Sequence, residues 1–584
     1  MGQFASLAAG ERAKRVAVSW EKAAGVVAAL AVIYLIGGPL FMLLFSSVRS
    51  TRERLPFEAT SFTLENFQRV FGSTASYQLF TNTLLFAAGT VALSLAVAVG
   101  FAYLIERTNI PFRTLVLTLV LAPMALPPFV SGIAWVLLAN PVNGYLNVTL
   151  RTALGLSGEG PLNVYSIPGM ILVSAVIFVP SLFIMISGTF ARMDQTLEEA
   201  AWLSGAGTWR TLRRITLPLL RPGIYGAAIY YLIIAVELFE IPALLGMPAD
   251  VYVLSTWIYY LVHKQGGLPD YGLAAGYAML TVILASVMTI FYGRMIGRQD
   301  RFATVTGRGY RPRLIDLGRW RLVVFSGVAV YFLFAVLVPF VAVILKSILP
   351  PYADISLPSL AVANLNQYVK LLTNSYMQAA ARNTAIIAVT TATGTMILAT
   401  LVAWLSVRSG FRGRTLPDRL AFVSTGTPAI VVGLAIMFLY LSAPVPIYGT
   451  IWIIAIGMAT RYIAYGSRVM STAYLQLHRE LEEASWTSGV SWLRTLAGIV
   501  APLIWPSFAR GWLWMFAHSI RDVGIPLMLV SVGNETIAVR LWLTWFFSAD
   551  LPYASAIAVV LMLASAALTF LVARQTLVVR DTGR

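Results

Sequence analysis

Long apolar segments dominate this sequence and restrict what it can fold into. A membrane-spanning helix needs roughly 20 mostly apolar residues, and backbone groups inside hydrocarbon must hydrogen-bond within their own segment, which favours helices. Only 11% of the 584 residues are charged and 58% are hydrophobic, whereas a soluble domain has about 25% charged residues. The sequence therefore predicts an all-α polytopic membrane protein with about twelve spans, at residues 24–48, 80–105, 114–139, 167–190, 223–246, 270–296, 320–346, 384–407, 418–442, 446–473, 504–530 and 551–575.

Basic residues lie mainly in the short segments between the apolar ones. The formal net charge is +17, and this scattered distribution is typical of cytoplasmic membrane loops rather than of a nucleic-acid-binding surface. Arginines cluster in residues 301–320, which we expect to be a cytoplasmic linker between a first half, residues 1–300, and a second half, residues 321–584. The same rule places both termini in the cytoplasm, although segment 49–79, expected outside, also carries arginines.

Metal and cysteine chemistry find little support in the composition. The chain has no cysteine, which excludes disulfides and thiolate metal sites. Its three histidines, His263, His478 and His518, are far apart in sequence, and no spacing suggests a metal site. The basic N-terminus leads into a long apolar segment without a convincing cleavage site, so we expect a retained first membrane helix rather than a signal peptide.

A polar stretch, LEEAAWLSGAGTWRTLRRITLPLLRP at 197–222, recurs as LEEASWTSGVSWLRTLAGIVAPLIWP at 481–506. The two copies are in register at an offset of 284 residues (483 − 199 = 284). Further matches, such as Asn82 with Asn383, have an offset of 301 (383 − 82 = 301), and a longer loop at 140–166 in the first half, expected outside, explains the difference. Each half has an even number of predicted spans in the same order, so we expect parallel repeats.

Each polar stretch has the features of a short helix, a turn and a second helix. In the first copy, Thr196 opens a possible capping box, Gly205 supplies a residue that tolerates a left-handed backbone, and Pro218 and Pro222 are expected to interrupt the second helix. We call residues 196–218 and 480–502 the first and second bracket. One such segment alone fits a loop on lipid headgroups equally well, but two copies with matched spacing favour a repeated protein-docking device.

The pattern Glu-Ala-Ala, three residues, Gly, nine residues, Ile-x-Leu-Pro resembles the signature of membrane subunits of binding-protein-dependent ABC importers. The first copy matches at Glu199, Ala200, Ala201, Gly205, Ile215, Leu217 and Pro218. The second matches at Glu483, Ala484, Gly489, Ile499 and Pro502, and departs from the pattern at Ser485 and Ala501. The resemblance extends over nearly the whole chain and implies two fused permease domains.

This resemblance implies partners and a division of labour. In the family, the short helix of the bracket is a coupling helix, here near 196–206 and 480–490, that sits in a groove of a cytoplasmic ATPase. The implied partners are two copies of an ABC ATPase and an external substrate-binding protein, in a bacterial inner membrane. No GxxxxGK[ST] phosphate loop occurs in the chain, so we expect ATP and Mg to bind the ATPase and this subunit to be no enzyme.

Charged residues inside the apolar segments are candidates for a translocation path, because charges in a membrane are costly and usually functional. Glu237 and Glu240 precede Pro242, and Arg521 and Asp522 occupy the equivalent stretch of the second half. The 284-residue offset places Glu237 opposite Arg521, which predicts an ion pair between the halves that acts as a gate. A purely structural buried pair, or residues near the outer interface, is the alternative. Arg461 receives no role from the sequence.

The segments FEIPALLGMPADVYVLSTWIYYL and RYIAYGSRVMSTAYLQLHRELEEAS resemble fused permeases of the ferric-iron type. That resemblance implies ferric iron as the cargo, with polyamines, thiamine or aminoethylphosphonate as cargoes of related branches. An ion-coupled secondary transporter is a more remote alternative, because it has no use for a duplicated docking bracket. A membrane enzyme would need convergent catalytic groups, and the sequence offers none.

Overall fold

The computed structural model describes residues 23, 25–50, 55, 58, 61–264, 267–296, 314–351, 353, 357–410 and 413–581. Within these residues the fold is helical, and extended pairing is limited to two isolated bridges, Arg49 with Phe62 and Thr108 with Ile315. The basic N-terminus and most of the arginine-rich linker, including 297–313, lie outside the described residues, so the predicted cytoplasmic position of the termini stays a prediction.

The two halves repeat the same elements at nearly constant offsets. The first half contains η1(Ile33–Gly37), α2(Gly38–Ser47), α3(Glu65–Gly72), α4(Thr74–Arg107), α5(Arg113–Leu121), α6(Pro128–Ala139), α7(Tyr145–Leu154), α8(Ile167–Arg192), α9(Thr196–Leu203), α10(Thr208–Thr211), η3(Leu212–Thr216), α11(Leu217–Glu237), η4(Pro242–Gly246), α12(Leu254–Val262) and α13(Tyr271–Ile296). The second contains α14(Arg321–Phe332), η8(Leu333–Leu337), α15(Val338–Ile348), α16(Leu357–Leu360), α17(Asn366–Thr373), α18(Ser375–Arg408), α19(Leu416–Val423), α20(Ala429–Ser442), α21(Ile451–Gln476), α22(Glu480–Thr487), α23(Trp492–Thr495), η10(Leu496–Val500), α24(Ala501–Arg521), α25(Gly524–Met528), α26(Ile537–Leu543) and α27(Leu551–Asp581).

The number of spanning helices is lower than the sequence predicts. Nine helices of the described residues are long and apolar enough to cross a membrane, or ten if a bent pair counts as one span. That pair, Arg113–Ala125 with Pro128–Ala139, replaces the predicted span 114–139 and is bent by 94°, because Pro127 and Pro128 interrupt the helix. In the second half, predicted span 418–442 is likewise divided into α19 and α20.

Predicted span 446–473 corresponds to α21, a helix of 26 residues. At about 1.5 Å per residue this helix is long enough to cross a bilayer, although it carries Arg461 and Arg468 and is absent from the nine most apolar helices. The all-helical, two-repeat architecture is therefore confirmed, although predicted spans 114–139 and 418–442 are each divided into two helices and span 446–473 carries two arginines.

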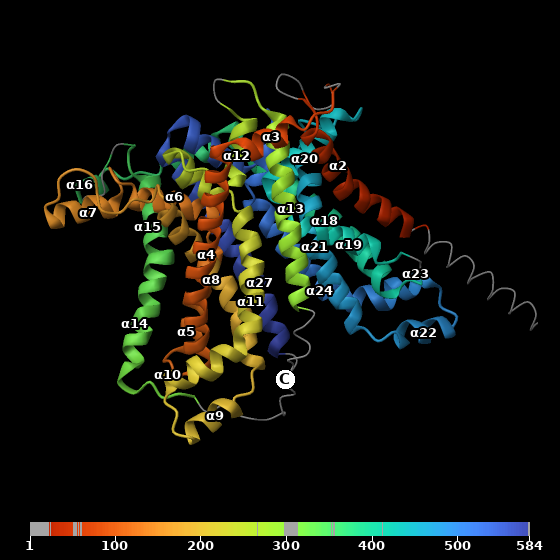
Figure 1. The fold of residues 1–584 in the computed structure, drawn as a ribbon, viewed down its shortest axis with the longest axis horizontal. Helices are drawn as coiled ribbons and strands as arrows, with labels where there is room; N and C mark the ends of the chain where they lie inside the picture. Colours follow the sequence, from red (N-terminus) through yellow and green to blue (C-terminus); the bar gives the residue numbers. More distant parts are fainter. Residues whose placement is uncertain are drawn as a thin grey trace, which may run out of the picture.

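Packing confirms the parallel arrangement of the repeats. Helix α4 packs along α8 in the first half, as α18 packs along α21 in the second. The first helix of each half reaches the other half, since α2 packs on α20 and α15 packs on α6. In Figure 1, α9–α10 lie at the lower end of the molecule and α22–α23 lie at its right side, so the two brackets are well separated.

The expectation that proline interrupts the second helix of each bracket is wrong. A single helix runs from Thr208 to Glu237, and it includes the π-helical turn Leu212–Thr216 directly before Pro218. Pro218 lies near the start of α11, and Pro222 lies inside it. A π-helical turn widens the helix and changes the hydrogen-bond register, which lets the chain pass a proline without breaking. The equivalent turn Leu496–Val500 precedes Pro502.

Candidate functional site

The two brackets have the same turn chemistry. Gly205 and Gly489 adopt left-handed backbones with φ of 80° and 78°, as the sequence predicts. Each turn is closed by two hydrogen bonds: Gly205 N donates to Trp202 O and Ala206 N to Ala201 O, and the corresponding pair occurs at Gly489 and Val490. These two hydrogen bonds end α9 and α22 at equivalent residues and set the angle of the next helix.

The predicted capping box at Thr196 is wrong. The residue before α9 is Gln195, and its side chain makes no capping hydrogen bond. Instead, Thr196 donates from its backbone N and from Oγ1 to Asp194 Oδ1, at 3.0 and 2.9 Å. An aspartate two residues ahead of the helix competes well for these donors because its side chain reaches them directly.

A buried ion pair anchors each bracket to the long helix of its half, α4 or α18. Arg107 Nε lies 2.8 Å from Glu198 Oε2, and both side chains are only 3% exposed. Arg408 Nε lies 3.1 Å from Glu482 Oε1, with 10% and 8% of the side chains exposed. The arginines end α4 and α18, and the glutamates lie in the first turn of α9 and α22. The pairs are thus equivalent in the two repeats.

The same arginines also donate hydrogen bonds to the end of the helix that precedes each bracket, α8 or α21. Arg107 Nη2 donates to Phe190 O at 3.2 Å, and Arg408 Nη2 donates to Tyr474 O at 3.1 Å and Leu477 O at 2.6 Å. One guanidinium therefore fixes the bracket, the long helix and the end of α8 or α21 as a unit, because arginine presents several donors in a rigid fork. The sequence analysis missed these residues. Their matching offsets, 301 for the arginines and 284 for the glutamates, could have revealed them.

The sequence-predicted bracket residues differ in how far they are exposed to solvent. Ser485 is buried and shares a 2.8 Å hydrogen bond with Thr495 Oγ1. Ala200, Gly205, Ala484, Gly489 and Pro502 are exposed, and Glu483 forms an exposed ion pair with Arg479 at 3.4 Å. Partly buried are Glu199, Ala201, Ile215, Leu217, Pro218 and Ile499.

Each bracket helix exposes a leucine on its outer face, and the first bracket exposes a second one. Leu197 and Leu481 occupy equivalent positions and are each 46% exposed, and Leu203 is 88% exposed. Exposed leucines next to small residues such as Ala200 and Ala484 form a flat surface that a partner can approach closely. Since Glu198 and Glu482 hold the opposite face, each bracket presents this surface in a fixed orientation.

The charged residues of the membrane interior gather where two helices end. Helix α11 ends at Glu237 and α24 ends at Arg521, at equivalent positions of the two repeats. The backbone leaves the helix at Leu238 and Asp522, four residues before Pro242 and Pro526, so the predicted breaks occur slightly earlier than the prolines.

The predicted ion pair between Glu237 and Arg521 is not formed. Glu237 Oε2 lies 3.9 Å from Nη2 of Arg461, which belongs to α21 of the second half. Arg521 instead contacts His518 Nε2 at 2.6 Å and donates to Met124 O of the first half at 3.4 Å. The two-fold relation places Glu237 and Arg521 at equivalent positions, but equivalence does not bring them into contact. Contacts between the halves are nevertheless made by both arginines.

Asp522 is held by Tyr462, whose hydroxyl donates to Asp522 Oδ2 at 2.8 Å. Tyr462 is the neighbour of Arg461 on α21, so this bond brings the break after α24 next to the arginine that meets Glu237. Glu237 Oε1 is buried and has no hydrogen-bond partner among the described residues. Within those residues, no three acidic or histidine side chains are arranged to hold a metal ion.

An aromatic cluster contributes to the contact between the two halves. Trp542 of α26 stacks on Phe129 and Phe239 of the first half, with ring centroids 5.3 and 5.4 Å apart. Tyr259 of α12 meets the same indole at 5.7 Å. All four rings are buried. These large rings pack the two halves against each other at this position, since aromatic side chains bury a large apolar area.

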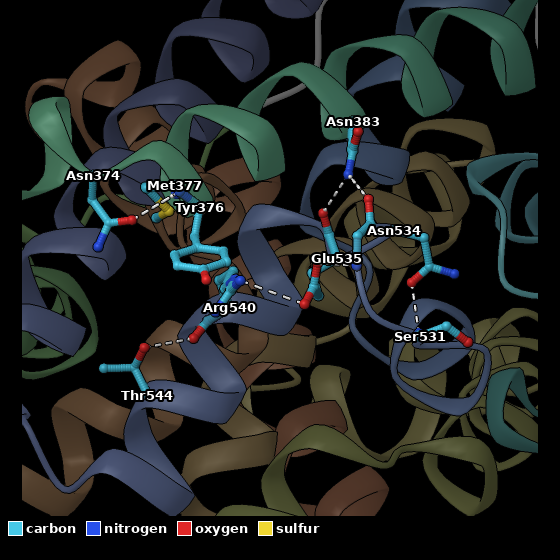
Figure 2. Close-up of polar contacts among 10 residues, drawn as sticks. Asn374, Tyr376, Met377, Asn383, Ser531, Asn534, Glu535, Arg540 and Thr544 are labelled. Carbon is cyan, nitrogen blue, oxygen red and sulfur yellow. Dashed lines mark hydrogen bonds and ion pairs between the residues drawn. The ribbon is translucent and has the colours of Figure 1, made fainter.

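Asn82 and Asn383 each join two elements of their own half. Asn82 Nδ2 donates to Tyr252 O at 3.2 Å. Asn383 Nδ2 donates to the carbonyls of Gly533 and Glu535, at 2.9 and 3.2 Å, and Figure 2 shows it directed from α18 toward the loop before α26. Each asparagine thus ties the long helix of its half to the loop before a short helix.

Comparison with known proteins supports the assignment made from these features. Residues 92–301 and 395–579 match the family described as the binding-protein-dependent transport system inner membrane component. The ferric transport system permease protein FbpB of Actinobacillus pleuropneumoniae is 26% identical over 494 residues, which cover 82% of this chain and 68% of that protein. A putative FbpB 1 of Haemophilus influenzae is 26% identical over 82% of this chain and 74% of that protein.

A solved bacterial ABC transporter involved in the import of the acidic polysaccharide alginate has 23% sequence identity and a TM-score of 0.38, and it covers 49% of this chain and 98% of that chain. The assignment rests on the family match, which includes both brackets and most of the chain. It describes a multi-pass inner membrane subunit of a transporter, rather than an enzyme, that works with a substrate-binding protein. The chain belongs to the family of binding-protein-dependent transport system inner membrane components.

Proposed function

We propose that this chain forms the membrane passage of an importer that receives ferric iron from an external binding protein and is driven by two copies of a cytoplasmic ABC ATPase. The proposed cargo is supported by the relatives described as ferric transport permeases. The observation that carries the ATPase partnership is the duplicated bracket, held in each half by an equivalent buried ion pair. ATP and Mg would bind the ATPase, and both termini would lie in the cytoplasm.

The brackets are connected mechanically to the candidate path. The helix that starts at Thr208 in the first bracket runs without interruption for 30 residues to Glu237, a length of about 45 Å. In the second half, η10 and α24 form one helix from Leu496 to Arg521. A movement of either bracket is therefore transmitted by a rigid helix to the charged residues at its end, as alternating access between two repeats requires.

The path itself is assigned to Glu237, Glu240, Arg521 and Asp522, and the structure adds Arg461. Glu237 and Arg461 belong to different halves and face each other at 3.9 Å. Their contact is expected to be made and broken as the halves move, so it can act as the gate that the sequence assigned to Glu237 and Arg521. Carboxylates at this place suit a cationic cargo, because an uncompensated positive charge in a membrane interior needs a counter-charge.

Reconstitution tests the proposed function. The purified chain, its binding protein and the ATPase are assembled in proteoliposomes, and uptake of radioactive iron is followed with and without ATP. Uptake is expected to require all three proteins and to stop when ATP is withheld. Iron uptake driven by an ion gradient without ATP would identify a secondary transporter. Uptake of a polyamine, thiamine or aminoethylphosphonate in place of iron would correct the cargo.

The gate is tested in the same vesicles with Arg461→Gln and a matched control. Arg468→Gln is the control, because Arg468 lies on the same helix and forms a more exposed contact with Asp418 at 3.8 Å. Loss of Arg461 leaves Glu237 buried without a counter-charge, and the coupling of ATP hydrolysis to uptake is expected to fall about tenfold. Normal coupling in the Arg461 variant would show that the contact is only structural.

A further inference from the structure

Among the described residues, the first bracket has a neighbouring segment for which the second bracket shows no equivalent. Residues 314–317, which we call the strap, belong to the described end of the arginine-rich linker and run beside the loop after α4. Figure 1 shows this green segment passing between the foot of α14 and the α9–α10 region. A groove lies between strap and bracket, and its lining residues are Glu199, Trp202, Leu203, Ala206, Gly207 and Thr208 of the bracket together with Leu314, Ile315 and Asp316 of the strap.

The strap is held firmly in place. Ile315 N donates to Arg107 O at 2.8 Å, and Asn109 N donates to Ile315 O at 3.1 Å. The Asn109 side chain then binds both ways: Nδ2 donates to Asp316 Oδ1 at 2.6 Å, and Oδ1 accepts from Leu317 N at 3.0 Å. Because Arg107 is also the residue that anchors Glu198, the strap and the bracket share one support.

The second half lacks the side chain that holds the strap in the first half. The residue equivalent to Asn109 at the 301-residue offset is Gly410, which has no side chain to hold a strap. The difference between the two brackets therefore follows from the residue types at equivalent positions, and it does not depend on the shape of the groove alone.

The groove also differs in charge from the second bracket. Glu199 forms no ion pair with any described residue. Asp316 lies across the groove with its side chain 75% exposed, and its Oδ1 lies 3.7 Å from Nη2 of Arg321. Hydrogen bonds from Asn109 and from the backbone of Gly318 lower the pKa of Asp316, so it is negatively charged at neutral pH. In the second bracket, Glu483 is already paired with Arg479, whereas the position equivalent to Arg479 in the first is the uncharged Gln195.

We propose that the strap and the first bracket together form an enlarged seat for one of the two ATPase copies, so that identical ATPases bind the two halves unequally. The seat fits an apolar side chain of the ATPase flanked by basic residues, because the groove combines the exposed Leu203 with the carboxylates of Glu199 and Asp316. This inference rests on the proposed function. The first half is then the tighter of the two seats.

Two single-seat chains allow each seat to be measured alone. Leu197→Glu places a charge on the exposed face of the first bracket and leaves the second seat, and Leu481→Glu does the reverse at the equivalent, equally exposed position. Into each we introduce Leu314→Ala with Asp316→Asn, which removes the apolar wall and the charge of the strap. The asparagine keeps an oxygen that can accept from Asn109. Arg319→Gln is the control, since Arg319 is exposed on the same segment and does not line the groove.

Binding of the ATPase that co-purifies with this chain, expressed separately, is titrated in lipid nanodiscs at low and at high salt. In the Leu481→Glu chain the strap variant is expected to bind about fivefold more weakly, with a smaller difference at high salt. In the Leu197→Glu chain it is expected to bind like its parent. Arg319→Gln should leave both unchanged.

Equal loss at both seats, or no loss at the first, would overturn the inference. If Leu314→Ala with Asp316→Asn lowers the unfolding temperature, Asp316→Asn alone replaces it, with an expected loss of about twofold at the first seat only. An ATPase that binds neither single-seat chain nor the unmodified chain would refute the proposed function itself, and the inference with it. Binding to both seats with no effect of the strap would refute the inference alone.

Discussion

The buried pair of Arg107 and Glu198 gives the sharpest prediction, because both side chains are only 3% exposed. We consider Arg107→Met, which keeps an unbranched side chain of similar length and removes the charge. Glu198 would then stay buried with the hydroxyl of Thr216 as its one described side-chain hydrogen-bond partner. The hydrogen bond from Arg107 to Phe190 O would be lost as well.

The magnitude follows from the cost of leaving a charge unpaired. Breaking a buried ion pair by removing one partner costs about 3–5 kcal/mol. The pair joins the bracket to the end of α4, so the energy is expected to appear first as local opening of residues 194–216 rather than as global unfolding. A loss of about 3 kcal/mol raises the population of the opened bracket about 10²-fold.

Amide hydrogen exchange measures this opening directly. Exchange in peptides from the first bracket is expected to accelerate about 10²-fold in Arg107→Met, while the second bracket, held by Arg408 and Glu482, keeps its rate. Arg113→Met is the control. Arg113 pairs with Glu106 at 3.1 Å but is 53% exposed, and an exposed pair contributes about 0–1 kcal/mol.

A double variant separates the ion pair from general damage. Replacing Arg107 with Met and Glu198 with Leu removes both charges, and such replacements are often neutral or stabilising. Exchange in the first bracket should therefore return close to the original rate. If Arg107→Met leaves exchange unchanged, or if the double variant opens more than the single one, the reasoning that this pair anchors the bracket is wrong.

Three further predictions concern the turn, the aromatic cluster and the outer loops. Gly489→Ala is expected to destabilise its bracket by about 1–2 kcal/mol because φ is 78° there, whereas Gly207→Ala, at φ −71° with open space around the Cβ, should be neutral; hydrogen exchange distinguishes the two. Trp542→Ala empties the cluster between the halves, so a loss of about 3–5 kcal/mol is expected in thermal unfolding, and the exposed Trp505 is its control. Asn383→Ala leaves two carbonyls without their donor (Figure 2) and is expected to cost about 1–3 kcal/mol in the same assay, with an unchanged unfolding temperature counting against the tie.

Parts of the candidate site could be predicted from local pattern alone. The left-handed turns at Gly205 and Gly489 were predictable because glycine followed a short helical pattern at a repeated spacing. The anchors Arg107 and Glu198 were not, since 91 residues separate them (198 − 107 = 91). The anchoring arginines could also be explained more simply, as charges of cytoplasmic loops. A contact between distant residues leaves no periodic signal in either segment.

The partner of Glu237 shows the limit of reasoning from the repeat. The offset correctly placed Glu237 and Arg521 at equivalent helix ends. Equivalent positions of two repeats are related by the symmetry axis, and they touch only if they lie close to it. Packing of α21 brings Arg461 to Glu237 instead. The prolines near the brackets gave a similar error, because a π-helical turn carried the helix through them.

The sequence by itself determined that this protein consists of membrane helices and that it contains two equivalent halves. Apolar length requires helices in a membrane, and matched spacing requires two equivalent halves, since both are consequences of local composition and order along the chain. Only the tertiary structure decided which charged residues meet and which prolines the helices tolerate. It also showed that the strap lies beside the first bracket. These outcomes depend on the packing of helices against one another, and that packing is set by side chains from segments far apart in sequence.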